Sequence, residues 1–180
     1  SQVKLRAQRL GLNLGRIDIF CDTRSEVLVK LLEGSSYEVV VIDSLQTLGS
    51  EEIPSPAGSV NQIRFCSTML VGLCKQKGIS LFLVGHVTKE GTLAGPKVIE
   101  HLVDTVLYFE QVNSGVRLIR AAKNRYGSVD EIGIFSMGEK GLKPVTNPAS
   151  FFISERGDDP LPAGIAFSAV LEGSRTFLVE

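Results

Sequence analysis

The chain contains 180 residues with a formal net charge of −1 and a hydrophobic content of 43%, which is typical of a globular protein with one main core. The near-neutral charge excludes a global basic field, so any contact with nucleic acid must come from local clusters of cations. Three cysteines without a Cys-x-x-Cys pair favour a reducing cytoplasm over a disulfide framework or a zinc site. No apolar run is long enough to span a membrane and no signal-peptide pattern opens the sequence, so we expect a cytoplasmic protein.

The first half of the chain predicts alternating helices and strands. An amphipathic helix is expected at the N-terminus, because Val3, Ala7 and Leu10 recur at helical spacing. This helix has no cap, and the last residues stop inside a strand pattern, so we expect a piece of a longer protein. After the helix we expect, in chain order, a strand at residues 15–22, a helix at 24–35, a strand at 37–44, a helix at 59–78 and a strand at 79–86.

Two of these strands, at residues 37–44 and 79–86, are uninterrupted apolar runs that each end in a polar residue. Such runs indicate strands of a parallel sheet that are buried on both faces. The helix between them carries an apolar stripe and closes at Gly78. Strand, helix and strand therefore form a predicted crossover unit.

The second half predicts a different arrangement. Residues 104–111, 115–123 and 131–145 have strand patterns joined by tight turns, which indicates an antiparallel extension of an otherwise parallel sheet. Proline, glycine and aspartate concentrate in residues 147–164, as is typical of a linker, and residues 165–180 form one strand-like stretch. We therefore predict an α/β core at residues 1–145, a linker at 146–162 and the beginning of a second domain at 163–180.

Polar residues stand at the carboxyl ends of both apolar strands, which is where ligands bind in open parallel sheets. Asp43 follows four apolar residues, the pattern of a Walker B strand whose carboxylate orients a hydrated Mg²⁺ on a nucleotide. The alternative is an aspartate that caps a turn. His86 could sense a terminal phosphate, and the alternative for it is a structural histidine. The spacing leaves both alternatives open.

The phosphate-binding motif that accompanies a Walker B strand, GxxxxGK[ST], does not occur in the sequence. Residues 91–97, GTLAGPK, have the wrong spacing and are typical of a flexible loop, as are residues 48–59. Each loop follows one of the polar strand ends, so we expect both on one face, where they could touch a polymer. The alternative is a pair of solvent loops, and Glu51 and Glu52 disfavour strong phosphate affinity in the first.

Lys123 and Arg125 lie two residues apart in the stretch IRAAKNRYGSVDE, so a strand would project them from the same face. With Arg117 and Arg120 they form a basic segment in a mildly acidic chain. Composition alone favours a solvated strand face for this segment. Arginine and lysine also hydrogen-bond phosphate, and if the chain's own nucleotide lies elsewhere, they would have to reach the nucleotide of a neighbouring subunit.

Six blocks of sequence follow one another along the chain: VVVIDSLQTL, SPAGSVNQIRFC, FLVGHVTKEGTLAGPKVIEHLVDTVLYFE, LIRAAKNRYGSVDEIGIF, MGEKGL and NPASFFISER. In this order they resemble the bacterial RadA (Sms) family of RecA-related ATPases of DNA repair and recombination. The resemblance extends over nearly the whole chain, and the blocks GHVTKEG and KNRYG are its most specific parts.

The resemblance implies a RecA-like P-loop NTPase core that binds ATP and Mg²⁺ and assembles as a homo-hexameric ring on single-stranded DNA. Members of the family carry an N-terminal zinc finger and the phosphate-binding loop, which would both lie upstream of Ser1, so zinc is expected only in that upstream segment. They also carry a C-terminal domain similar to Lon protease, which would begin at residues 163–180. A recombinase filament is a further candidate partner, and no membrane contact is implied.

The resemblance assigns the nucleotide site residue by residue. Asp43, with Ser44 beside it, matches the Walker B carboxylate that holds the Mg²⁺ shell, and His86 matches the strand-end residue that senses the terminal phosphate. Lys123 and Arg125 match the two cations of a Lys-Asn-Arg-Phe-Gly signature that reaches the nucleotide of the adjacent subunit.

The resemblance also covers the residue after Arg125 and the two loops that follow the strands. The chain has Tyr126 in place of the phenylalanine of the signature, which leaves both cations intact. The loops after Asp43 and His86 match those that face single-stranded DNA, with Lys89 and Lys97 as the phosphate contacts of the second loop.

The function that the resemblance implies is a DNA-dependent ATPase, a helicase-like ring motor that processes recombination intermediates by branch migration. These 180 residues alone are expected to be inactive, because they lack the phosphate-binding loop. The alternative is a non-catalytic recombination adaptor that binds DNA or partner proteins through the same fold. Peptidase activity is disfavoured, because the chain ends before a Lon-like domain could supply a Ser–Lys pair.

Overall fold

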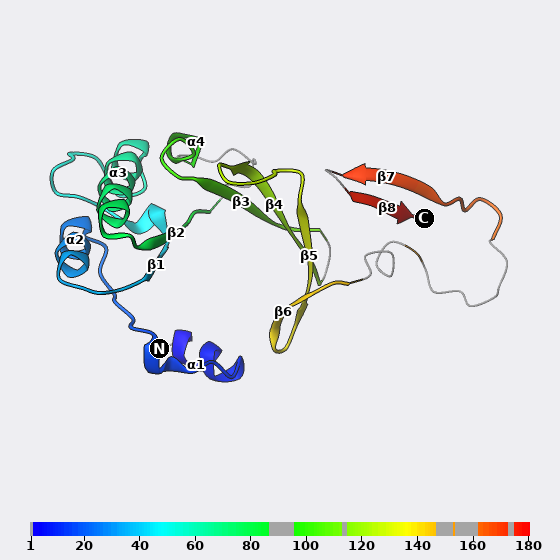
Figure 1. The fold of residues 1–180 in the computed structure, drawn as a ribbon, viewed down its shortest axis with the longest axis horizontal. Coiled ribbons are helices and arrows are strands. Elements are labelled where there is room, and N and C mark those ends of the chain that lie inside the picture. The colour runs from blue at the N-terminus through cyan, green and yellow to red at the C-terminus, as the bar shows by residue number, and fades with distance from the viewer. Residues whose placement is uncertain (1, 87–95, 113–114, 147–152, 154–161, 173–174) are drawn as a thin grey trace. The chain divides into compact units, whose positions relative to one another are not determined.

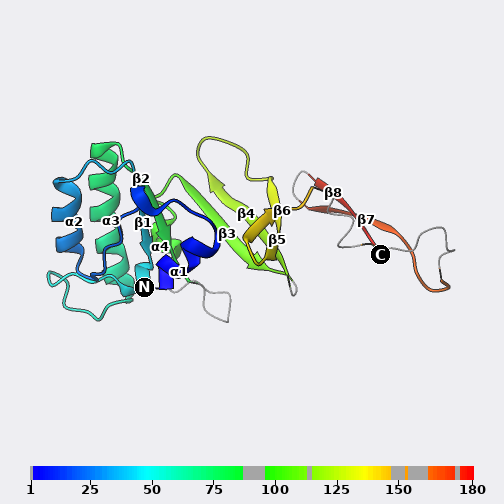
Figure 2. The same cartoon turned by 90° about the horizontal axis from the view of Figure 1, so that it is seen from below.

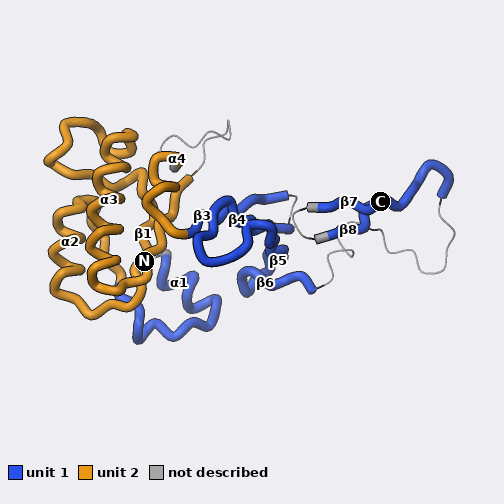
Figure 3. The backbone as a smooth tube through the Cα atoms, turned by 45° about the horizontal axis from the view of Figure 1, so that its top comes forward, with its two compact units in different colours: residues 1–18, 105–180 blue, residues 19–104 orange. Residues whose placement is uncertain are grey.

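A computed structural model describes residues 2–86, 96–112, 115–146, 153, 162–172 and 175–180 (Figure 1). The chain divides into two compact units, residues 19–104 and residues 1–18 with 105–180 (Figure 3). The hydrogen-bonded sheets each lie within one unit. No helix in the described part of the chain combines the length and the apolarity that a membrane span needs.

The unit of residues 19–104 contains the predicted crossover. Its elements are α2 (Ser25–Glu33), β1 (Val39–Asp43), the short 3₁₀ helix η2 (Leu45–Thr47), α3 (Val60–Lys77), β2 (Ser80–Val84) and α4 (Pro96–Ile99). β1 and β2 pair in parallel, in a register that runs from Val39 opposite Ser80 to Asp43 opposite Val84. The predicted strand–helix–strand order and the parallel pairing are therefore confirmed.

Local signals explain where α3 begins and ends. The hydroxyl of Ser59 accepts a hydrogen bond from the backbone N–H of Gln62 at 3.4 Å, which caps the first turn. Gly78 ends the helix with φ +69°, in the left-handed region that glycine adopts without strain. α2 and α3 lie side by side, with the two strands next to α3 (Figure 2). Their facing side chains form the core of the unit: Leu28, Leu32, Ile42, Leu45, Ile63, Cys66, Leu70 and Cys74.

The two strands are not buried on both faces, as their apolar runs predicted. Ile42 is buried in the core, whereas Val41 and Phe82 are 61% and 59% exposed. The cause is that successive side chains of a strand point to opposite faces, and within this unit the helices cover one face only. The prediction of full burial is therefore wrong for the described chain.

The strand predicted at residues 15–22 does not form. Residues 14–16 make a 3₁₀ turn instead, which begins where the side chain of Asn13 accepts a hydrogen bond from the N–H of Gly15 at 2.9 Å. Downstream, one parallel bridge joins Arg24 to Gly49. A single bridge supplies too few ladder hydrogen bonds to hold a strand, so this part of the prediction is wrong.

The other unit contains α1 (Gln2–Arg9), as predicted, and the strands β3 (Thr105–Gln111), β4 (Val116–Asn124), β5 (Ile132–Gly138) and β6 (Gly141–Pro144). The four strands form an antiparallel sheet in sequence order, with Val116, Ile132 and Ile134 as its buried centre. This sheet is not hydrogen-bonded to β1 and β2, so it is not the predicted extension of one continuous sheet.

Two single predicted strands are hairpins in the structure. The stretch 131–145 divides into β5 and β6, because Gly141 at φ +92° reverses the chain after Lys140. The stretch 165–180 divides into β7 (Ser168–Glu172) and β8 (Arg175–Val179), which pair antiparallel. Most of the predicted linker lies outside the described residues, and the three-part domain division stays a prediction.

Candidate functional site

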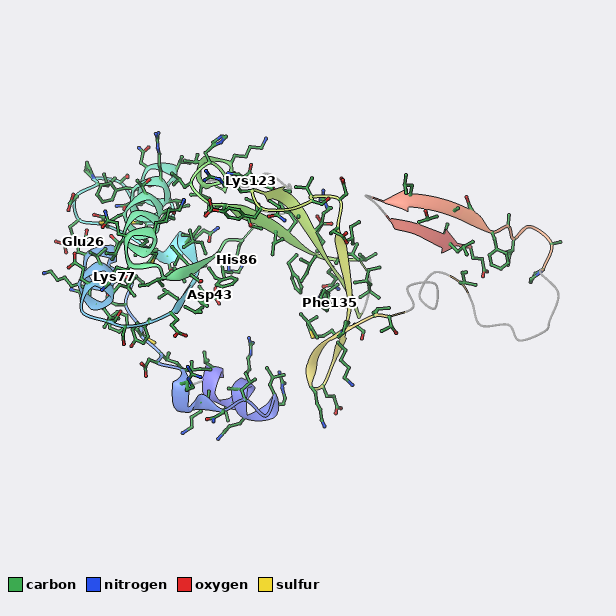
Figure 4. All side chains as sticks on the ribbon, viewed as in Figure 1. Glu26, Asp43, Lys77, His86, Lys123 and Phe135 are labelled. Atoms are coloured by element: carbon green, nitrogen blue, oxygen red, sulfur yellow. The ribbon has the colours of Figure 1, made fainter. Side chains whose placement is uncertain are left out.

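Asp43 and His86 lie side by side at the carboxyl ends of the parallel strands (Figure 4). Asp43 is the last residue of β1 and faces Val84, two residues before His86. Nε2 of His86 lies 3.9 Å from Oδ1 of Asp43, an ion pair when the imidazole is protonated. Both side chains are open to solvent, with exposed fractions of 71% for Asp43 and 70% for His86. The prediction that these strand ends are neighbours is confirmed.

Two side-chain hydrogen bonds hold the backbone next to Asp43 and His86. Nε2 of Gln46 donates a hydrogen bond to the carbonyl of His86 at 3.1 Å, which ties the end of β2 to the turn after β1. The hydroxyl of Thr47 donates to the carbonyl of Ser44 at 2.8 Å, and the side chain of Ser44 is buried. Ser44 therefore belongs to the support of the site, and Asp43 and His86 are the groups that a ligand can reach.

The carboxylate of Asp43 fits a hydrated divalent cation. Among the described residues, no group of three or more histidine, cysteine, aspartate or glutamate side chains could hold a metal ion. Mg²⁺ commonly keeps several waters and binds through one or two carboxylates together with phosphate oxygens. An exposed carboxylate at a strand end could supply one protein contact of such a shell.

The loop of residues 48–59 is anchored by the side chain of Gln62. Nε2 of Gln62 lies 2.9 Å from each of three loop carbonyls, and Oε1 accepts a hydrogen bond from the N–H of Ser50 at 2.9 Å. The carbonyls belong to Ser50, Ile53 and Ser55. Gln62 is only 3% exposed. The loop has no regular secondary structure, yet a buried amide sets its path, which the prediction of a flexible loop did not include.

A second contact joins the same loop to α2. The hydroxyl of Ser50 donates a short hydrogen bond to the carboxylate of Glu26 and accepts one from the N–H of Glu52 at 3.1 Å. The hydrogen bond from Ser50 lowers the pKa of Glu26 below its ordinary value. The loop is thus held from α3 and from α2 together.

The second predicted loop is described only at its end. Lys97 is exposed and lies in α4, whose Ile99 packs into the core of the unit. Lys89 lies outside the described residues. The structure therefore places one of the two predicted DNA contacts on a short helix that is fixed to the core, and leaves the other as a prediction.

The motif of Lys123 and Arg125 lies where β4 ends. Lys123 is half-buried and faces Val106 across the β3–β4 ladder, close to a break in the register between Val106 and Leu107. The strand ends at Asn124, so Arg125 lies in the following turn and is exposed. The prediction that a strand projects both side chains from the same face is therefore wrong for Arg125. Lys123 lies on the strand, whereas the backbone conformation of the turn sets where the side chain of Arg125 points.

The other two cations of the basic segment are engaged on the sheet. Nη2 of Arg120 lies 2.7 Å from Oε1 of Glu110, and its guanidinium stacks 5.6 Å from the ring centre of Tyr108. Nη1 of Arg117 donates to the carbonyl of Val116 at 3.1 Å. Both arginines therefore contact groups of the sheet.

The arrangement defines a class of protein: a mixed α/β chain with acidic and imidazole groups at the carboxyl edge of parallel strands, where ligands bind in such folds. No protein-family model matches the chain. It is 47% identical over 180 residues to the DNA repair protein RadA of Pseudomonas aeruginosa and 46% identical to that of Bacillus subtilis, covering 99% of this chain in each case. The RadA of Treponema pallidum is 45% identical over 179 residues.

These matches show the family. The chain belongs to the bacterial DNA repair protein RadA family over the region that it spans. It spans about 39% of the length of the relatives named above. The resemblance of the six sequence blocks is thereby confirmed, and membership of this family implies a RecA-like region.

Proposed function

We propose that the full-length protein is a DNA-dependent ATPase of homologous recombination and DNA repair. The observation that carries this proposal is the parallel pairing of β1 and β2, which brings Asp43 and His86 within 3.9 Å at the edge where nucleotides bind. Membership of the RadA family gives the DNA repair context. The protein is proposed to move on single-stranded DNA as a homo-hexameric ring and to drive branch migration.

ATP and Mg²⁺ are the proposed ligands, and the metal would neutralise charge on the phosphates. The carboxylate of Asp43 would hold and orient the ion through its water shell. His86 lies beside that carboxylate and would donate a hydrogen bond toward the terminal phosphate. Gln46 holds the carbonyl of His86, which fixes the backbone that presents the imidazole.

Lys123 and Arg125 are proposed to act on the nucleotide of a neighbouring subunit. Lys123 lies near the end of β4 and Arg125 in the turn that follows it. A cation that reaches a nucleotide across an interface stabilises the charge that spreads over the phosphate oxygens in the transition state. Hydrolysis at such interfaces would then move the loops that contact DNA.

The ATPase proposal is tested by Asp43→Asn in the full-length protein. Loss of the carboxylate should lower the DNA-stimulated ATPase rate by about ten- to a hundredfold, because the Mg²⁺ shell loses its charged partner. Glu33→Gln is the matched control, since Glu33 is an exposed carboxylate on α2. A parent protein that shows no ATPase activity with DNA and Mg²⁺ would favour the alternative, a non-catalytic recombination adaptor.

The DNA-contact loop is tested by the double variant Lys89→Ala with Lys97→Ala. Each lysine that neutralises a phosphate releases counterions, so the slope of log affinity against log salt should fall by about 1 for each lysine. The measurement is binding of labelled single-stranded DNA at several salt concentrations. Lys30→Ala, which removes an exposed lysine of α2, serves as the control. Equal slopes in the double variant and the parent would remove these lysines from the interface.

A further inference from the structure

The turn after β4 carries an aromatic side chain that the proposed chemistry of Lys123 and Arg125 does not use. Tyr126 is 79% exposed, more than any other large apolar or aromatic side chain in the described residues. An exposed aromatic ring gains nothing from the core of its own fold. Exposed aromatic rings of this kind commonly serve recognition, because they offer a large flat surface at a small cost in conformational entropy.

The backbone that presents this ring is held in place. The side chain of Asn124 accepts a hydrogen bond from the N–H of Tyr126 and donates one to the carbonyl of Ser128, both at 3.2 Å. At Gly127, a Cβ would lie 2.9 Å from Nδ2 of Asn124, so a larger residue would disturb this clamp. The hydroxyl of Ser128 also accepts from the N–H of Asp130 at 3.0 Å. The ring is therefore displayed on a preorganised turn, which lowers the entropic cost of binding.

The chemistry on either side of the ring indicates its ligand. Arg125 precedes Tyr126 and is exposed, and Lys123 lies at the end of the strand that leads into the turn. Cations bind phosphate, and an aromatic ring stacks on a nucleobase irrespective of its identity. A nucleotide, free or within a nucleic acid strand, offers both groups a few ångströms apart.

We propose that Tyr126 stacks on a nucleobase whose phosphate contacts Arg125 and Lys123. This assignment rests on the proposed function of the same motif. Two sources supply the same chemistry: the adenine of ATP held by a neighbouring subunit, and a base of single-stranded DNA. In either case Tyr126 is a binding residue, and Asn124 is the positioning residue that holds it.

The test compares Tyr126→Phe and Tyr126→Leu in the full-length protein. Phenylalanine keeps the aromatic face, so its KM for ATP and its Kd for oligo-dT should match those of the parent. Leucine keeps apolar bulk without a face, so one of the two constants should rise by about tenfold or more. A rise in the KM for ATP identifies adenine as the partner, and a rise in the Kd for oligo-dT identifies a DNA base.

A spectroscopic readout separates this proposal from the ATPase proposal. The 180 residues contain no tryptophan, so Tyr126→Trp introduces a reporter whose fluorescence should be quenched when a base stacks on it. Quenching by ATP or by oligo-dT supports the stacking role even if the protein hydrolyses no ATP. An abasic oligonucleotide and inorganic triphosphate are the controls, because they carry the phosphates without the base. The stacking role is overturned if base-bearing ligands quench no more than these controls and the leucine variant keeps both constants of the parent.

Discussion

Replacing Arg125 with alanine in the full-length protein is expected to lower the DNA-stimulated ATPase rate by about a thousandfold while leaving ring assembly intact. The reason is that Arg125 is the exposed cation of the turn beyond β4 that we propose to act on the nucleotide of a neighbouring subunit. A charge that acts only in the transition state affects kcat more than the binding of ATP. The measurement is steady-state ATPase activity with saturating single-stranded DNA.

Arg120→Ala is the matched control for this prediction. Arg120 lies on β4, the strand that leads into the turn of Arg125, and carries the same charge; its Nη2 pairs with Oε1 of Glu110 on the surface of the sheet at 2.7 Å. Its loss should change the rate by no more than about twofold, because exposed ion pairs contribute little. Equal rates for the Arg125 and Arg120 variants, with assembly checked by light scattering, would contradict the assignment of Arg125.

Replacing Gln62 with alanine is expected to destabilise the protein by about 2–4 kcal/mol, the largest effect on stability that we predict. The side chain is buried and its amide contacts four backbone groups of the loop at 2.9 Å each. Alanine leaves buried carbonyls and an N–H without partners, and each such group costs free energy. The measurement is urea denaturation of the full-length protein, together with proteolysis of residues 48–59.

Two further variants sharpen this prediction. Asn61→Ala removes an exposed amide from the adjacent position of α3 and should change the free energy of unfolding by less than about 0.5 kcal/mol. Gln62→Glu keeps the size of the side chain but places a carboxylate against three carbonyl oxygens, so it should destabilise the protein at least as much as alanine. If Gln62→Ala behaves like Asn61→Ala, the amide does not anchor the loop.

Local signals predicted the part of the site that depends on single strands and helices. The caps at Ser59 and Gly78 set the bounds of α3, and the apolar run before Asp43 set those of β1. Because the chain needs a crossover to return in parallel, the pairing that brings Asp43 and His86 together also follows from the order of elements.

The features of the site that depend on tertiary contacts could not be predicted from the sequence. A polar glutamine in a helix predicts a surface position. Only the packed structure shows that Gln62 is buried under a loop that begins 14 residues earlier in the sequence. The apolar run of β2 could not reveal that Phe82 faces outward, because a continuous run fits one covered face or two. Likewise Asn124 is a polar residue between two cations in the sequence, and only the structure shows that its side chain clamps the turn.

The central claim is that each ATPase site combines Asp43 of one subunit with Arg125 of its neighbour. Two variants whose own activity is strongly reduced, Asp43→Asn and Arg125→Ala, test it when they are mixed before ring assembly. An interface with an intact Asp43 on one side and an intact Arg125 on the other should hydrolyse ATP, so an equal mixture should regain about a quarter of the parent activity. If both residues serve the nucleotide of their own subunit, no mixture regains activity, and that result would contradict the account.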